Sequence, residues 1–133
     1  MRACPNERAP PPVPPRAVPG DVLIVEDNYI IVLDLEAMLQ ELGVPSVRSA
    51  SSVRGALDLI AASLPQLGLI DINLGTDKSF EVAERLSQLG IPFVFTTGYG
   101  DRYAFPAHFA DARILCKPYT LEALRDAITA RQE

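Results

Sequence analysis

The sequence of 133 residues has no tryptophan, a single histidine and only two cysteines. No apolar run approaches the roughly 18–20 residues that cross a membrane, and the N-terminus lacks the apolar core of a signal peptide. We therefore expect a cytoplasmic protein that does not bind a membrane. Cys4 and Cys116 lack metal-ligand spacing, and Cys116, within an apolar strand pattern, is interpreted as a small buried hydrophobic residue. His108 has no evident partner, which favours a surface position.

Excess positive charge is also missing from most of the chain. The net charge is −5, and residues 1–20 carry three arginines and one glutamate, which leaves −7 on the remainder. Binding to nucleic acid needs a basic face, so this acidic body argues against direct nucleic-acid binding. The expected partners are proteins, small ions or phosphorylated groups.

Residues 1–20 hold seven of the twelve prolines and show no periodic apolar pattern. This composition predicts a disordered, Pro-rich tail with some polyproline II character. The tail is either a ligand for a proline-recognition domain or, more simply, a solvated extension or an overlong start. The folded domain is expected to span residues 21–133.

Beyond the tail, short apolar runs alternate with stretches of helical periodicity. The predicted strands are residues 22–25, 44–49, 67–70, 91–95 and 113–116, and the predicted helices are residues 28–42, 52–63, 79–89 and 119–131. Strands and helices that alternate through short links form an α/β fold with a parallel sheet covered on both faces. The weak second run is expected at a sheet edge. Residues 98–111 contain two glycines and a proline, so a helix there should be short or absent.

Polar side chains stand at the carboxyl ends of four of the five predicted strands. They are Asp27, Asp71, Thr97 and Lys117. In open α/β sheets, ligands bind in the crevice outside these strand ends. Asp27 alone could cap the helix that follows, and Thr97 could satisfy a backbone donor. Four such groups at corresponding positions favour a binding site over coincidence.

The chemistry of this cluster can be inferred from its residue types. The carboxylates of Glu26, Asp27 and Asp71 would repel one another unless a cation lay among them, and hard oxygen ligands favour Mg²⁺. Lys117 suits a phosphate and could pair with Asp71 at rest, while Thr97 could donate to a phosphoryl oxygen. An aspartate in such surroundings can act as a nucleophile that forms an acyl phosphate.

Four motifs, in this order, resemble those of response-regulator receiver domains: VLIVEDN, LIDINLG, PFVFTTG and Lys117-Pro118. The resemblance covers about residues 21–131. It implies a doubly wound, five-stranded parallel sheet with the flavodoxin-like strand order 2-1-3-4-5. It also implies a phosphohistidine donor on a sensor histidine kinase, in two-component signalling.

The resemblance further implies the role of each site residue. Asp71 is the phosphoacceptor, Thr97 the switch hydroxyl and Lys117 the lysine that pairs with the phosphoryl group. The implied Mg²⁺ ligands are Asp27 directly, Glu26 partly through water, Asp71, and the backbone carbonyl of Asn73.

FTTGYG is similar to the FATGYG-type motif of a receiver subgroup that is often paired with HWE or related histidine kinases. Because no output domain follows residue 133, we expect a stand-alone, chemotaxis-regulator-like receiver that is a monomer or weak dimer. It would act by docking onto a downstream protein, or as a phosphate sink in a shared phosphorelay. Apart from its own phosphorylation and dephosphorylation, it is not expected to be an enzyme.

Two departures from the family pattern affect how phosphorylation would be read out. Gly75 stands where many receivers have proline, and Ile114 occupies the position of an aromatic residue that usually swings inward on phosphorylation. We expect residues 98–111, with Tyr99 and Tyr103, to become ordered on phosphorylation instead; the alternative is a loop that stays flexible and has no part in signalling.

Two other functions remain open from the sequence. DINLGT also resembles the haloacid dehalogenase-type phosphatases, but Asn73 stands where their acid/base aspartate would be, and an amide cannot protonate a leaving group. The other is an interaction module that keeps the fold without being phosphorylated.

The first predicted helix has apolar residues on two sides. The stripe expected to face the core consists of Ile31, Leu35, Met38, Leu39 and Leu42. Tyr29 and Leu33 fall on the opposite side, flanked by Ile30 and Ala37. This second set is either scattered surface residues or a docking patch for the helical phosphotransfer domain of the kinase.

Overall fold

The computed structural model describes residues 18–74, 77–98, 113–117 and 119–129. Its elements are β1 (Asp21–Val25), α1 (Tyr29–Glu41), β2 (Ser46–Ala50), α2 (Val53–Ala62), β3 (Leu67–Asp71), β4 (Asn73–Leu74), β5 (Asp77–Lys78), α3 (Phe80–Gln88), β6 (Phe93–Thr97), β7 (Arg113–Cys116) and α4 (Leu121–Thr129). All five predicted strands and four predicted helices are present, with ends that differ by no more than two residues.

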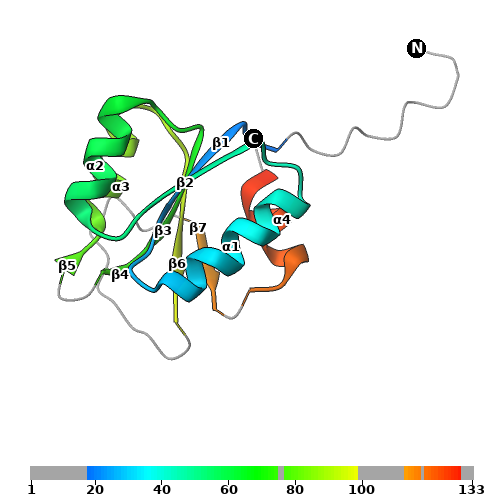
Figure 1. Cartoon of the computed structure of the whole chain (residues 1–133). Coiled ribbons are helices and arrows are strands. Elements are labelled where there is room, and N and C mark those ends of the chain that lie inside the picture. Colours follow the sequence, from blue (N-terminus) through cyan, green and yellow to red (C-terminus); the bar gives the residue numbers. More distant parts are fainter. Residues whose placement is uncertain (1–17, 75–76, 99–112, 118, 130–133) are drawn as a thin grey trace, which may run out of the picture.

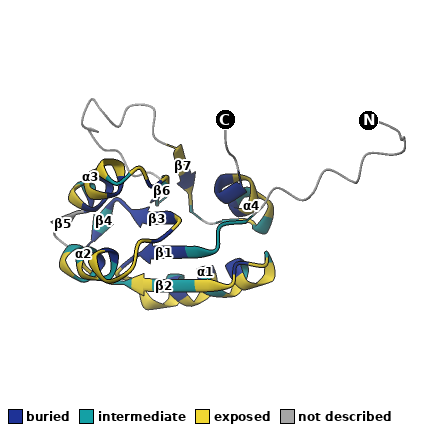
Figure 2. Ribbon diagram, turned by 90° about the horizontal axis from the view of Figure 1, so that it is seen from above, coloured by how far each residue is buried: buried dark blue, intermediate teal, exposed yellow. Residues whose placement is uncertain are grey.

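The main sheet has the order β2-β1-β3-β6-β7, and all four pairings are parallel. This order confirms the doubly wound, flavodoxin-like arrangement. The central strands β1 and β3 are almost wholly buried, whereas β2 lies at one edge and has no buried residue (Figure 2). The weak second run is therefore the edge strand that its pattern predicts.

Helices cover both faces of this sheet, α1 and α4 on one and α2 and α3 on the other (Figure 1). Two hydrophobic clusters result. The cluster under α1 and α4 contains Val22, Ile24, Leu35, Leu39, Leu69, Val94, Leu115 and Leu124. The cluster under α2 and α3 contains Leu23, Val25, Ile60, Ile70, Val82, Leu86 and Phe95. The alternation of each strand's side chains between the faces places successive residues in different clusters.

A short hairpin that the sequence did not predict follows β3. The two-residue strands β4 and β5 pair antiparallel, and both the backbone N–H and the hydroxyl of Ser79 donate to the carbonyl oxygen of Ile72. Strands of two residues are too short to show an alternating pattern. The hairpin fixes the chain directly after Asp71.

Arg48 ties the edge strand β2 to its neighbours. Its guanidinium group pairs with the Asp21 carboxylate, with Nη2 2.6 Å from Oδ2. Nη1 and Nη2 also donate to the carbonyl oxygens of Leu59 and Ser63, at 3.1 and 2.8 Å. These two carbonyls lie at the C-terminal end of α2, and the Leu59 carbonyl also accepts from the backbone N–H of Ser63. One side chain thus joins β1, β2 and α2.

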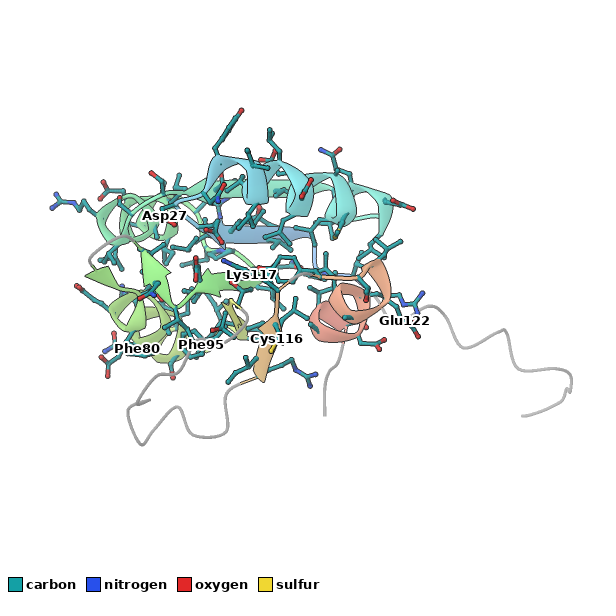
Figure 3. All side chains as sticks on the ribbon, turned by 90° about the horizontal axis from the view of Figure 1, so that it is seen from below. Asp27, Phe80, Phe95, Cys116, Lys117 and Glu122 are labelled. Carbon is teal, nitrogen blue, oxygen red and sulfur yellow. The ribbon has the colours of Figure 1, made fainter. Side chains whose placement is uncertain are left out.

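The prediction that Cys116 is buried is wrong. Cys116 is exposed on β7 (Figure 3), and Ile114 on the same face retains 42% of its accessible surface. Only Leu115, which points to the opposite face, is buried in this strand. β7 is an edge strand, and its apolar run RILC resembled a strand covered on both faces.

Several expectations fall on residues outside the described ranges. They include the tail up to residue 17, Gly75, and almost all of the 98–111 segment with Tyr99, Tyr103 and His108. Val18 is described and packs against the core cluster under α1 and α4. None of the described helices is long and apolar enough to cross a membrane.

Candidate functional site

Three carboxylates converge at the carboxyl end of the sheet. Glu26 directly follows β1, Asp71 is the last residue of β3, and one oxygen each from Glu26, Asp27 and Asp71 lie within 4.8 Å of one another. Glu26 and Asp71 are 3% and 6% exposed, whereas Asp27 is open to solvent. The parallel order of the strands therefore produces the acidic cluster that the sequence predicts.

Lys117 bridges two of these carboxylates. Its Nζ lies 3.1 Å from Glu26 Oε1 and 3.2 Å from Asp71 Oδ2, and its side chain is four-fifths buried. Its backbone N–H donates to the carbonyl oxygen of Thr97 at 2.8 Å, which aligns the residue with the end of β6. Lys117 and Asp27 are labelled in Figure 3. The pairing of Lys117 with Asp71 agrees with the resting arrangement proposed from the sequence.

Backbone N–H groups bind the two buried carboxylates at the oxygens that Lys117 does not contact. The N–H of Asn28 donates to Glu26 Oε2 at 3.1 Å, and the N–H of Asn73 donates to Asp71 Oδ1 at 3.2 Å. Asn28 also caps α1, because its side chain accepts from the backbone N–H groups of Ile30 and Ile31. Helix capping therefore does not account for Asp27, and its place in the cluster needs another explanation.

The charges in this cluster are unbalanced. Burial, and then the negative charge of Asp71, raise the pKa of Glu26 to about 7. Burial lowers the pKa of Lys117, but the charges of Asp71 and Glu26 outweigh that effect and hold its pKa above the usual value. One lysine faces three carboxylates, so the site carries more negative charge than its own cation neutralises.

A hard divalent cation fits this donor set. Every candidate ligand is an oxygen, as Mg²⁺ prefers. Glu26 Oε1 is buried and accepts no hydrogen bond in the described part of the chain, although it forms an ion pair with Lys117. An added positive charge beside Asp27 would relieve the repulsion that raises the Glu26 pKa.

The other predicted site residues lie at the same edge. Thr97 ends β6 and is half-buried, in register with Cys116 of β7. Asn73 opens β4, and its backbone N–H contacts Asp71. The ligand role of its carbonyl and the switch role of Thr97 stay predictions.

Sequence reasoning missed two residues beside the site. Thr96 is buried and is the register partner of Asp71 across β3 and β6. Tyr119 has a buried hydroxyl, and burial raises the pKa of that hydroxyl to about 12. The only available signals were that Thr96 precedes Thr97 and that Tyr119 follows Lys117 by two residues.

The first turns of α1, which begin beside the cluster, expose three large apolar side chains. Tyr29, Ile30 and Leu33 keep 71%, 70% and 45% of their accessible surface. The opposite face of α1 packs into the core, as predicted for the apolar stripe. Val32 is also buried on this face, although the predicted stripe did not include it. We call the three exposed residues the α1 patch.

Comparisons with known proteins agree with this geometry. Sensory transduction protein LytT of Bacillus subtilis (strain 168) is 30% identical over 111 residues, which cover 80% of this chain and 46% of LytT. Transcriptional regulatory protein PdtaR of Mycobacterium tuberculosis is 32% identical over 115 residues, which cover 84% of this chain and 56% of PdtaR. This chain therefore spans about half the length of these two relatives.

Solved structures of related proteins are also similar to this chain in fold. The solution structure of SdrG from Sphingomonas melonis Fr1 is 37% identical, with a TM-score of 0.72, and the match covers 80% of this chain and 91% of SdrG. A BeF₃-activated conformation of SdrG matches with a TM-score of 0.69 at 35% identity, over 81% of this chain and 92% of that one. The family model for the response regulator receiver domain matches residues 22–129. The chain therefore belongs to the response regulator receiver domain family.

Proposed function

We propose that this receiver domain accepts a phosphoryl group on Asp71 from a phosphohistidine of a sensor histidine kinase. The observation that carries the proposal is the placement of Asp71. Its carboxylate is buried at a strand end, it contacts Lys117, and it lies within 4.8 Å of two further carboxylates. A carboxylate that is held at a strand end beside a lysine and further metal-binding carboxylates has the surroundings that a phosphoryl-accepting nucleophile requires.

The transfer is an in-line displacement at phosphorus. A carboxylate oxygen of Asp71 attacks the phosphorus, a P–O bond forms, and the P–N bond to the histidine breaks. The departing imidazole takes the electron pair and then a proton from solvent. Lys117, already within 3.2 Å of Asp71, stabilises the negative charge on the transferring group. Attack by water on the acyl phosphate returns inorganic phosphate and the Asp71 carboxylate.

We propose Mg²⁺ as the resident ion, held by Asp27, Asp71 and the Asn73 carbonyl, with Glu26 acting partly through water. When bound, the ion would supply positive charge within the acidic cluster and would stabilise the phosphoryl oxygens. Thr97, at the end of β6, is proposed to hydrogen-bond a phosphoryl oxygen and so to report its presence to the chain that follows.

The α1 patch is proposed as the docking surface for the helical phosphotransfer domain of the kinase, of the HWE or a related family. It begins at Tyr29, two residues after Asp27, so a bound helix would bring its histidine to the site. The matched test compares Leu33→Glu with Leu64→Glu, since Leu64 is also exposed but lies beyond α2. Leu33→Glu should slow phosphotransfer from the kinase and leave labelling by acetyl phosphate unchanged. Equal rates for both variants would refute the patch.

The output is proposed to be either docking onto a downstream protein or service as a phosphate sink, in the cytoplasm. The lifetime of the phosphorylated state distinguishes these two outputs. A phosphate sink should lose its phosphoryl group faster than a second receiver that is phosphorylated by the same kinase. The receiver family match speaks against the phosphatase reading, as does the amide of Asn73. Turnover of p-nitrophenyl phosphate by the wild type would revive that reading.

The direct experiment is phosphotransfer profiling with the histidine kinases of the host. The wild-type protein should be labelled by at least one kinase in the presence of Mg²⁺, and Asp71→Asn should not be labelled. Labelling of Asp71→Asn at the wild-type rate would refute the proposed acceptor. Failure of Mg²⁺ to bind the wild type would favour a module that is not phosphorylated.

A further inference from the structure

Tyr119 carries a polar atom that the resting protein does not use. Its ring is partly buried against the core cluster under α1 and α4, together with Leu124 and Ile128. Its hydroxyl is buried and makes no hydrogen bond within the described part of the chain. A phenylalanine would pack in the same place without this cost, because an unpaired buried hydroxyl loses its hydrogen bonds to water.

The surroundings of this hydroxyl are those of the phosphoacceptor site. Lys117 lies two residues earlier, and the groups that act on the pKa of Tyr119 are Thr96, Lys117, Glu26 and Asp71. Burial raises that pKa to about 12; the Thr96 side chain and the charge of Lys117 act to lower it, and the charges of Glu26 and Asp71 act to raise it. The hydroxyl therefore keeps its proton at neutral pH and can act only as a neutral donor or acceptor. Glu26 Oε1, a buried acceptor without a hydrogen bond, belongs to the same cluster.

We propose that Tyr119 is a positioning residue whose hydroxyl lacks an acceptor at rest and gains an anionic oxygen of the site when Asp71 is phosphorylated. At rest, Lys117 divides its charge between Glu26 Oε1 and Asp71 Oδ2. A phosphoryl group on Asp71 attracts Lys117 away from Glu26. The Tyr119 hydroxyl then donates to the oxygen that Lys117 leaves, and this holds Lys117 in its new position.

The proposal predicts effects of opposite sign in the two states for Tyr119→Phe. In the resting protein, the variant loses only an unpaired hydroxyl, so its melting temperature should equal or exceed that of the wild type. In the phosphorylated state it loses a hydrogen bond, so that state should be weakened. A hydroxyl with a purely structural role would affect both states equally.

The test uses beryllofluoride with Mg²⁺ as the phosphoryl mimic and measures its affinity by titration calorimetry, beside thermal unfolding without ligand. Tyr119→Phe should bind beryllofluoride about 3- to 10-fold more weakly, the range that one net hydrogen bond represents. It should also shorten the lifetime of the acetyl phosphate-labelled protein, while its unliganded melting temperature does not fall.

Thr129→Val is the matched control. Thr129 is also a buried hydroxyl, but it lies on α4 and donates to the carbonyl oxygen of Arg125 at 2.7 Å. This variant should lower the melting temperature and leave beryllofluoride affinity unchanged. The opposite pattern in the two variants separates use at the site from general packing.

This inference rests on the proposed function, and the experiment distinguishes failure of the Tyr119 role from failure of that function. If wild type binds beryllofluoride and Tyr119→Phe binds it equally well, the role of Tyr119 is refuted and the proposed function stands. The role is also refuted if Tyr119→Phe lowers the unliganded melting temperature as Thr129→Val does. If wild type binds no beryllofluoride in Mg²⁺, both ideas fail together.

Discussion

Ionisation of Glu26 should make the metal-free protein less stable at neutral pH than at mildly acidic pH. The carboxyl group is 3% exposed and faces Asp71, and these two causes raise its pKa from 4.5 to about 7. In the unfolded chain the same group titrates near 4.5. Between these values the folded protein holds a proton that the unfolded chain has released, so the free energy of unfolding falls as the pH rises.

The size of this effect follows from the pKa difference. One pKa unit corresponds to about 1.4 kcal/mol, so the difference between 4.5 and about 7 gives Glu26 a contribution on the order of 3 kcal/mol. It is fully present below pH 4.5 and lost above about pH 7. Lys117 has a raised pKa as well, but its contribution is lost only above its ordinary value of 10.5, outside this window. For a domain of this size, the difference amounts to several degrees in melting temperature.

The assay is thermal unfolding in EDTA between pH 5 and 7.5. We expect the melting temperature to fall across this range in the wild type, and the fall to be much smaller in Glu26→Gln, which cannot ionise. Glu122→Gln, at an exposed position on α4, is the control and should keep the wild-type dependence. Identical pH profiles for wild type and Glu26→Gln would refute the view that Glu26 is the strained carboxylate.

Three substitutions test the supporting structure. Arg48→Ala should lower the free energy of unfolding by about 2–4 kcal/mol in urea titrations, because it removes the cation that pairs with Asp21 and a donor to each of two helix-end carbonyls; a loss below 0.5 kcal/mol would contradict this. Gly68→Ala should cost about 1–3 kcal/mol in the same titrations, since an added Cβ would lie 2.7 Å from Leu86 Cδ1, and an unchanged midpoint would show that Leu86 moves freely. Lys117→Met leaves two buried carboxylates without their cation, so it should destabilise the metal-free protein by about 3–5 kcal/mol; added Mg²⁺ should recover part of this loss in thermal unfolding, and no loss in EDTA would contradict the ion-pair assignment.

The sequence was sufficient for the sheet and for the placement of the acidic cluster. Each strand is an apolar run followed by turn-forming residues, and the parallel order brings the carboxyl ends together whatever the side chains are. Glu26, Asp71 and Lys117 meet for that reason alone. The direction and order of the strands were therefore sufficient to predict where the site lies, and no information on side-chain packing was needed.

What could not be predicted depends on contacts between distant segments. Arg48 joins α2 to Asp21, and nothing in its neighbourhood along the chain indicates these partners. The exposure of Cys116 follows from which face of β7 the described helices leave uncovered, a property of the whole fold. Tyr119 is similar, because only packing shows that its hydroxyl is buried without a partner.

The most direct measurement for the central claim is to locate the phosphoryl group in the chain. Protein labelled by its kinase in Mg²⁺ would be reduced with borohydride, which converts an aspartyl phosphate to homoserine, and then digested and sequenced by tandem mass spectrometry. We predict homoserine at position 71 and at no other acidic residue. Homoserine at position 27, or labelled protein with an intact Asp71, would contradict the assignment of Asp71 as the phosphoacceptor.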